Sequence, residues 1–449
     1  MKKHQKNRTL YQKITQGYLY SMLTVFLLFC GAQGYQHIVE TKFRMFCVLC
    51  GGYVAIMAVL GIEEILIGNI TLSPARYLMK KSSWTQRFCI FYVGVTWISA
   101  IFSPYFPATI IGGSRYEGAL TITLYGLTFL LLSIFGHCAK GLLCVSSISV
   151  GLVSLLSIIQ MYGKNPFSLY PVGYTYLDAG KSYSGAYLGT LGNIDLMAAF
   201  LCLVVPILWI SLFRLKTRRR LLLMIPLTLA LFVLIKMRVQ AGLLGVFLGG
   251  IFSLPIILPD SKKRRIRAAF IIGIGFVTFL IVIFAFDSKL ELWHEIHLLF
   301  HGKVELSFGS GRLHIWREVL QKIPNHPILG NGPDTMIYAQ LQPFQRYDPA
   351  GQVLHVAQID VAHNEYLNVL YHQGVTGIVS FLLLVLASLK SWFKFGNEDA
   401  VIAILGGGIF CYCIQAFFSF SMCITAPFFW LEMGLLEGRT KRIKEDKSS

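Results

Sequence analysis

Repeated apolar stretches, each near the length that crosses a lipid bilayer, are the feature that most constrains this 449-residue chain. A transmembrane helix needs roughly 20 apolar residues, and about twelve stretches of that length can be delimited. Their approximate limits are 17–35, 45–66, 88–104, 118–136, 141–160, 185–212, 221–236, 239–259, 268–286, 372–393, 400–420 and 424–437. With 55% hydrophobic residues, the composition excludes a soluble domain of this size. The sequence therefore predicts an all-α, polytopic membrane protein.

The basic residues predict how these helices are oriented. If the N-terminus lies inside, 27 of the 40 Lys and Arg residues fall in inner segments and 13 in outer ones. The positive-inside rule then places both termini in the cytoplasm. The apolar run after the basic start lacks a small-residue cleavage site, so it is predicted to be a membrane anchor. We interpret the basic runs 216–220 and 262–267 as topology signals and contacts for anionic lipid, and no nucleic-acid partner is expected.

Four regions follow from this reading. They are nine helices in 1–286, a large extracytoplasmic catalytic loop in 287–371, three helices in 372–437, and a basic cytoplasmic tail in 438–449. The loop is predicted to be helical and folded over a cavity.

One helix of that loop is predicted between a Ser310 N-cap and Pro324. Its expected apolar stripe consists of Leu313, Trp316, Leu320 and Ile323. A turn at residues 331–334 then leads to a second short helix, with Asp334 near its start.

A titratable imidazole closes the loop. His363 and Asn364 are followed, after nine residues, by Gly374-x-x-Gly377 at the start of an apolar helix. A histidine pKa near neutrality suits a general base, and Asn364 is expected to orient the ring. A capping or core histidine is the alternative. The glycine pair is expected to let the helix pack closely under the end of the loop.

Two arginines could meet an anion on the same face. Arg312 follows Ser310-Gly311 at a helix N-terminus, where a cation is mildly unfavourable unless an anion binds. Arg238 lies in the short outer hairpin near residue 238, and contact with lipid phosphate is its alternative role. With His363, these guanidinium groups describe a site for a phosphate-bearing lipid, since guanidinium binds diphosphate bidentately.

Other polar residues are placed on the outer face. Arg115 and Glu117 are expected to form an ion pair at the rim of the cavity, and Asn193 either faces the cavity or bonds to neighbouring helices. Eight histidines are expected to be outside and wet: His294, His297, His301, His314, His326, His355, His363 and His372. The spacing of the first three could bind a metal, but no carboxylate completes a site, so no metal and no cofactor are expected.

These segments, taken together, resemble the bacterial O-antigen ligase family, which includes polymerases of similar layout. The resemblance covers about residues 110–380 and rests on GSRYEG, LGNIDLMAAFLCLVVP, MRVQAGLLG, GSGRLHIWREVLQKIPNHPILGNG and HNEYLNVLYHQGVTG. The family patterns are kept at six positions of the fourth segment: Gly311, Arg312, Trp316, Pro327, Gly330 and Gly332. The chain departs from the family at Met237 and Val239, which flank Arg238 where small residues are usual.

The resemblance implies a metal-independent glycosyltransferase of the bacterial cytoplasmic membrane, active on its outer face. It would move a glycan from an undecaprenyl-diphosphate carrier to an acceptor hydroxyl, as ligase or polymerase. His363 would be the base and Arg312 and Arg238 would hold the diphosphate. Arg115, Asn193, Asn364 and Trp316 would contact substrate. The expected partners are the lipid-linked donor, a glycan or lipid acceptor, membrane lipids and polysaccharide-assembly proteins.

Two other functional classes stay open. A transporter or flippase for lipid-linked glycan would need acidic or broken-helix features at mid-membrane. Glu63 and Glu64 near the inner end of the second span, and Glu432 in the last span, give this class thin support. A membrane sensor would use the histidine-rich outer loop.

Overall fold

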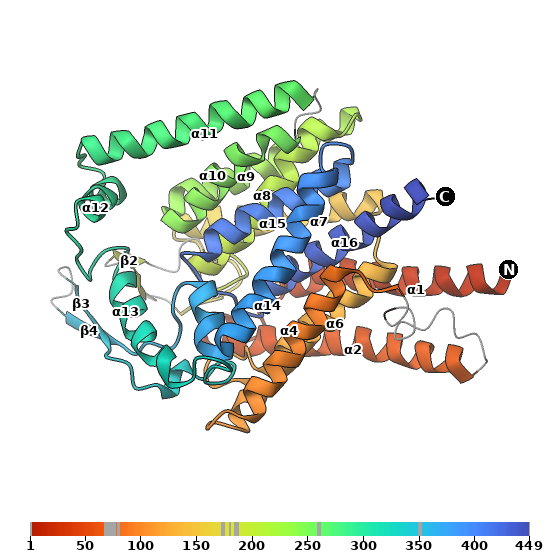
Figure 1. Ribbon diagram of the computed structural model, residues 1–449, viewed down its shortest axis with the longest axis horizontal. Helices are drawn as coiled ribbons and strands as arrows, with labels where there is room; N and C mark the ends of the chain where they lie inside the picture. The colour runs from red at the N-terminus through yellow and green to blue at the C-terminus, as the bar shows by residue number, and fades with distance from the viewer. Residues whose placement is uncertain are drawn as a thin grey trace.

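The computed structural model describes residues 2–66, 78, 81–171, 176–178, 181–183, 188–257, 262–348 and 353–448. The fold is all-α apart from two short hairpins, as the sequence predicts (Figure 1). The long helices are α1 (Lys2–Ser21), α2 (Ile38–Leu66), α4 (Trp84–Ile101), α6 (Ala119–Phe135), α7 (Lys140–Met161), α8 (Ile194–Arg214), α9 (Met224–Met237), α10 (Gln240–Ile257), α11 (Lys262–Ala285), α14 (Glu365–Phe395), α15 (Ala400–Ala416) and α16 (Ala426–Ser448).

Eleven of the predicted spans each fall mainly on one of these helices, whereas the first, 17–35, starts in α1 and runs on through the π-helical turn Met22–Phe26 and non-helical residues 29–33. Not all of the helices are equally suited to cross a membrane. Seven helices in the described part of the chain are long and apolar enough: Gly34–Leu66, Gly141–Met161, Ile194–Arg214, Arg218–Met237, Gln240–Ile257, Lys262–Ala285 and Glu365–Phe395. Two more, Ala119–Phe135 and Ala400–Ala416, are apolar but shorter. The membrane class is therefore confirmed, whereas the count of about twelve spans stays a prediction.

Helix α8 lies at the centre of the bundle, with α9, α10 and α15 packed against it. Its side chains are buried almost without interruption from Ile194 to Val205. The helix starts nine residues later than the predicted span at 185, because Asn193 caps it after turns in which Gly189 and Gly192 adopt positive φ. Part of the segment between the predicted spans 141–160 and 185–212 lies outside the described residues.

A buried lysine stabilises the end of the first helix. After α1 the chain forms a π-helical turn, Met22–Phe26, which leaves carbonyls without helical partners. The Lys42 ammonium donates to the carbonyls of Phe26 and Leu27 at 2.6 and 3.0 Å and is fully buried. This contact fixes α2 against the end of α1.

The large loop contains α12 (Glu291–Phe300), α13 (Arg312–Lys322), the 3-10 turns Ile323–Asn325 and Met336–Tyr338, and the hairpin of β3 (Phe344–Asp348) with β4 (Val353–Ala357). A second hairpin pairs β1 (Tyr176–Asp178) with β2 (Lys181–Tyr183). Figure 1 shows α12, α13 and both hairpins gathered at one end of the molecule, and both termini at the other. Residues 349–352 of the loop lie outside the described part.

Helix α13 differs in detail from the prediction. The N-cap is Gly311, with φ of 85°, rather than Ser310. The buried residues are Ile315 and Val319, while Leu320 of the expected stripe is 53% exposed. Ile315 and Val319 pack with Met336 and Tyr371. Contacts with residues distant in the sequence, rather than the local apolar pattern, therefore determine which face of α13 is buried.

The glycine pair at the start of α14 opens a break in that helix, into which the loop inserts. Gly374 adopts φ 66° and ψ −166°, a conformation open to glycine alone. The carbonyls freed at Tyr371 and His372 accept from the N–H groups of Asn331 and Gly332, at 3.0 and 2.8 Å. The N–H of Val375 donates to the Pro327 carbonyl at 2.9 Å. The expected close packing under the end of the loop is therefore present.

Candidate active site

The connection between α15 and α16, residues 417–425, is the point at which several predicted site residues meet. Arg312 donates from Nε to the Phe418 carbonyl at 3.0 Å and from Nη1 to the Gly309 carbonyl at 2.8 Å. One helical turn later, the Trp316 ring packs edge-on against Phe417, with centroids 5.8 Å apart. Two residues of α13 thus contact this connection, one by hydrogen bonding and one by aromatic packing.

His363 reaches the same connection from the start of α14. Its ring stands perpendicular to that of Phe420, with centroids 5.1 Å apart. The indole Nε1 of Trp316 donates at 2.9 Å to the carbonyl of Ala362, the residue before His363. The structure therefore brings His363, Arg312 and Trp316 together around one short segment. His363 also has a positive φ of 48°, which is unusual for a residue with a side chain.

Arg115 completes this group but not with the expected partner. Its guanidinium lies over the Phe420 ring, 4.5 Å from the centroid. It donates from Nε and Nη2 to both carboxylate oxygens of Asp360, each at 2.9 Å. The predicted Arg115–Glu117 ion pair is wrong, because Glu117 turns inward and accepts from the Tyr125 hydroxyl at 2.8 Å.

The backbone that carries Arg115 is folded around one carboxylate. Asp334 accepts from the N–H groups of Ser114 and Arg115 at 3.2 and 2.8 Å, and from the Ser114 hydroxyl at 3.1 Å. The N–H of Glu117 adds a weaker contact at 3.4 Å. A Cβ on Gly112 would stand 2.2 Å from the Asp334 carboxylate, so this loop requires glycine there. Burial raises the pKa of Asp334, against the lowering effect of its donors.

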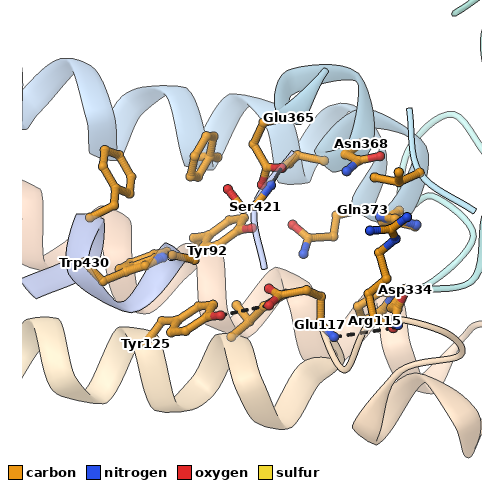
Figure 2. A pocket seen from close by; sticks show the side chains of 18 of the residues that line it. Tyr92, Arg115, Glu117, Tyr125, Asp334, Glu365, Asn368, Gln373, Ser421 and Trp430 are labelled. Atoms are coloured by element: carbon orange, nitrogen blue, oxygen red, sulfur yellow. Dashed lines mark hydrogen bonds between the residues drawn. The ribbon is translucent and has the colours of Figure 1, made fainter. Parts of the chain in front are cut away.

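Below the 417–425 connection lies a polar cavity of about 60 Å³ (Figure 2). Four acidic residues line it: Glu117, Asp334, Asp360 and Glu365. The Glu365 carboxylate accepts from the N–H of Ser421 at 2.8 Å. Burial raises the pKa of Glu117 well above its usual value. Ligand pockets are typically 300–1,000 Å³, so this cavity has room for a few waters but not for a sugar. His372, expected to be wet, is buried at its wall.

Both asparagines of the predicted site cap helices. The Asn364 side chain accepts from the N–H of Leu367 at 3.0 Å and begins α14. Asn193 accepts from the N–H groups of Asp195 and Leu196 at 2.8 and 3.1 Å and begins α8. Asn364 therefore positions His363 through the backbone that it fixes.

Arg238 lies at the same end of the bundle, on another hairpin. It ends α9 in the left-handed conformation, with φ of 56°, and is exposed between buried Met237 and Val239. In the next helix, Gly245 packs against Gln415 and Gly249 against Cys411, so α10 and α15 are antiparallel. The start of α10 therefore lies level with the end of α15, near the 417–425 connection.

The outer histidines do not form a metal cluster in the part of the chain that the structure describes, where no group of three or more His, Cys, Asp and Glu side chains could hold an ion. His294 instead bonds to Asp287 at 2.8 Å and His297 to the Ile283 carbonyl at 2.7 Å. The side chain of His355 lies outside the described residues.

Sequence reasoning missed the 417–425 connection because its first residues continue an apolar run and were read as the end of a span. It also missed Asp360 and Glu365. The only signal was the interruption of the run by Ser419 and Ser421.

The middle part of the chain is similar in sequence to known proteins. A family model described as O-Antigen ligase matches residues 226–382, from α9 into α14. A Rickettsia bellii (strain RML369-C) protein named "Putative polysaccharide ligase" is 28% identical over 159 residues, which are 35% of this chain and 37% of that protein. The matched part thus spans little more than a third of either chain. The residues matched by the family model include Arg238, Arg312, Trp316 and His363. Over residues 226–382 the chain is therefore similar to the O-antigen ligase family.

Proposed function

We propose that the protein is a membrane glycosyltransferase of cell-surface polysaccharide assembly. It transfers a glycan from undecaprenyl diphosphate to an acceptor hydroxyl, at the outer face of the bacterial cytoplasmic membrane. The observation that carries the proposal is that His363 and Arg312, both inside the region that matches the O-antigen ligase model, meet around the 417–425 connection.

The chemistry needs one proton acceptor and one anion site. The acceptor oxygen attacks the anomeric carbon, the bond from that carbon to the diphosphate oxygen breaks, and His363 takes the hydroxyl proton. The diphosphate leaves with its lipid and keeps the bonding electron pair. Neither a nucleotide sugar nor a metal is required, because a diphosphate is already a good leaving group.

Arg312 is suited to the departing diphosphate. A guanidinium carries five N–H donors, and two of its nitrogens are held by the carbonyls of Phe418 and Gly309. These bonds fix the plane of the group and leave further donors for a phosphate oxygen. Exposed Arg238, at the same end of the bundle, would contribute a second positive charge.

We place the reacting groups outside the polar cavity, because its volume of about 60 Å³ is too small for a sugar. Arg115 is already paired with Asp360 and packs on the Phe420 ring. We therefore assign it to positioning Phe420 and contacting the glycan, rather than to binding the diphosphate. The acceptor is a glycan or lipid hydroxyl. The name of the Rickettsia protein favours ligation over polymerisation.

The test is product formation by purified protein in detergent, from a lipid-linked glycan and an acceptor. His363→Ala should lower the rate by about 10²- to 10⁴-fold, the usual contribution of a general base. Exposed His326, on the same loop, is the matched control, and His326→Ala should leave the rate unchanged. Full activity of His363→Ala would refute the base assignment.

Arg312→Lys tests the bidentate contact, because lysine keeps the charge but not the fork of donors. We expect a loss of at least about tenfold, and no loss for Arg317→Lys on the exposed face of α13. Turnover without any ion gradient would separate an enzyme from a transporter. A sensor would show no turnover, with or without metal.

A further inference from the structure

A second cavity, far larger than the polar one, lies between α1, α7, α8, α9, α15 and α16. Its volume is about 980 Å³, and most of its wall is apolar, with Leu19, Ile207, Leu405 and Leu435 among the lining residues. Pockets that bind small molecules typically reach 300–1,000 Å³, so this space can hold acyl chains.

The cavity lies at the opposite end of the bundle from the candidate active site. It uses the first turns of α15, at Val401, Ile404 and Leu405, whereas the last turn of α15 leads to Phe417. The helix rises about 20 Å between Ile404 and Phe417. A ligand in this cavity therefore lies too far from His363 for its polar group to take part in the proposed reaction.

The lining changes from apolar to basic where the cavity meets the α8–α9 connection. Arg219 is exposed and Arg220 half-buried, and both line the cavity. Lys216 and Arg218 lie on the same connection, and residues 215–223 contain no acidic residue. Exposed Leu221 and other apolar residues follow directly, as expected of a segment at the membrane interface.

We propose that this cavity binds an anionic glycerophospholipid of the inner leaflet, with its acyl chains among the apolar residues and its phosphate on Arg219 and Arg220. Charge complementarity identifies the occupant, because guanidinium groups pair with phosphodiester oxygens and the inner leaflet is anionic. The one carboxyl in the wall, that of Glu432, lies at the level of Gly408 in the middle of α15, away from the arginines. It therefore does not compete for the headgroup.

The proposal is tested by native mass spectrometry of the delipidated protein in detergent. Dioleoyl phosphatidylglycerol, dioleoyl phosphatidylcholine and undecaprenyl phosphate are added separately. The wild-type protein should retain phosphatidylglycerol in preference to both others. The double variant Arg219→Glu/Arg220→Glu should lose this retention by at least about tenfold, since two attractive charges are replaced by repulsive ones.

Two further variants distinguish binding in the cavity from general attraction of lipid to positive surface charge. Gly151 lines the cavity, and a Cβ there would meet only Pro226, at 3.6 Å, so the side chain of Gly151→Leu should occupy part of the cavity and reduce retention. Lys262→Glu/Lys263→Glu reverses two exposed charges on α11, away from the cavity, and should leave retention unchanged. Equal losses in both charge variants, no preference in the wild type, or preferential retention of undecaprenyl phosphate would each overturn the proposal.

Discussion

The Asp334 carboxylate fixes the backbone of the loop that carries Arg115. Its four contacts keep residues 114–117 in place and so aim Arg115 at Asp360. A charge-assisted hydrogen bond contributes roughly 1.5–3 kcal/mol. We expect Asp334→Asn to lower the unfolding free energy by about this amount and to slow glycan transfer. The asparagine amide replaces one accepting oxygen with an NH₂ group, which would face the N–H donors of residues 114–117.

Thermal unfolding in detergent measures this change. Asp287→Asn is the matched control, because Asp287 is an exposed loop carboxylate that bonds only to His294 and Ser288 among the described residues. If both variants unfold at the same temperature as the wild type, Asp334 does not hold the loop.

Glu117 allows a prediction about pH. Burial raises the pKa of this carboxyl, so the folded protein binds a proton that the unfolded chain has already lost. Stability is therefore fully present below the unfolded pKa and declines as pH rises through the folded pKa. Glu117→Gln keeps an acceptor for Tyr125 without the ionisation. As pH rises above about 5, its melting temperature should decline less than that of the wild type. Parallel curves for the two proteins would contradict the assignment.

At the level of elements, the break in α14 joins the loop to the bundle. Gly374→Ala would place a Cβ 2.3 Å from the Ile328 carbonyl, at a backbone conformation that costs about 1–3 kcal/mol for other residues. The loop must then leave the break, and the hydrogen bonds that join its residues Pro327, Asn331 and Gly332 to α14 are lost. We expect a lower melting temperature and a loop that proteases cut faster.

Gly275→Ala in α11 is the control for that variant. A Cβ there meets nothing within 4 Å, and alanine is favoured over glycine in a helix by about 1 kcal/mol. It should be neutral or slightly stabilising. A Gly374→Ala protein as stable and protease-resistant as Gly275→Ala would show that the break is not required.

The sequence predicts elements well where the information is local. Apolar runs locate the long helices, because each needs only its own residues to indicate a span. The Gly374-x-x-Gly377 pair likewise predicts close packing. The partner of Arg115 could not be predicted, because Asp360 lies 245 residues away and Glu117, two residues away, is the nearer carboxyl. The buried face of α13 also depends on distant residues, and so does the cavity that Glu365 lines.

In the whole molecule, two ends with different chemistry are separated by an apolar bundle. One end carries His363, Arg312 and the 417–425 connection, with the large loop over it. The other carries both termini and the basic α8–α9 connection (Figure 1). The proposed reaction takes place at the outer face of the membrane, so it requires the first end, with the large loop, to face outward. The excess of Lys and Arg at the second end predicts the same orientation.

Protease sites test this orientation directly. One is inserted at Gly302, an exposed turn between α12 and α13 where a Cβ meets nothing within 4 Å, and one is appended after Ser449. Protease added to intact spheroplasts should cut at Gly302 and spare the C-terminal site, and lysis should expose both. Detergent-solubilised protein, cut at both sites, shows that each is cleavable. If intact spheroplasts lost the C-terminal site and kept the other, His363 would face the cytoplasm, and the proposed reaction at the outer face could not occur there.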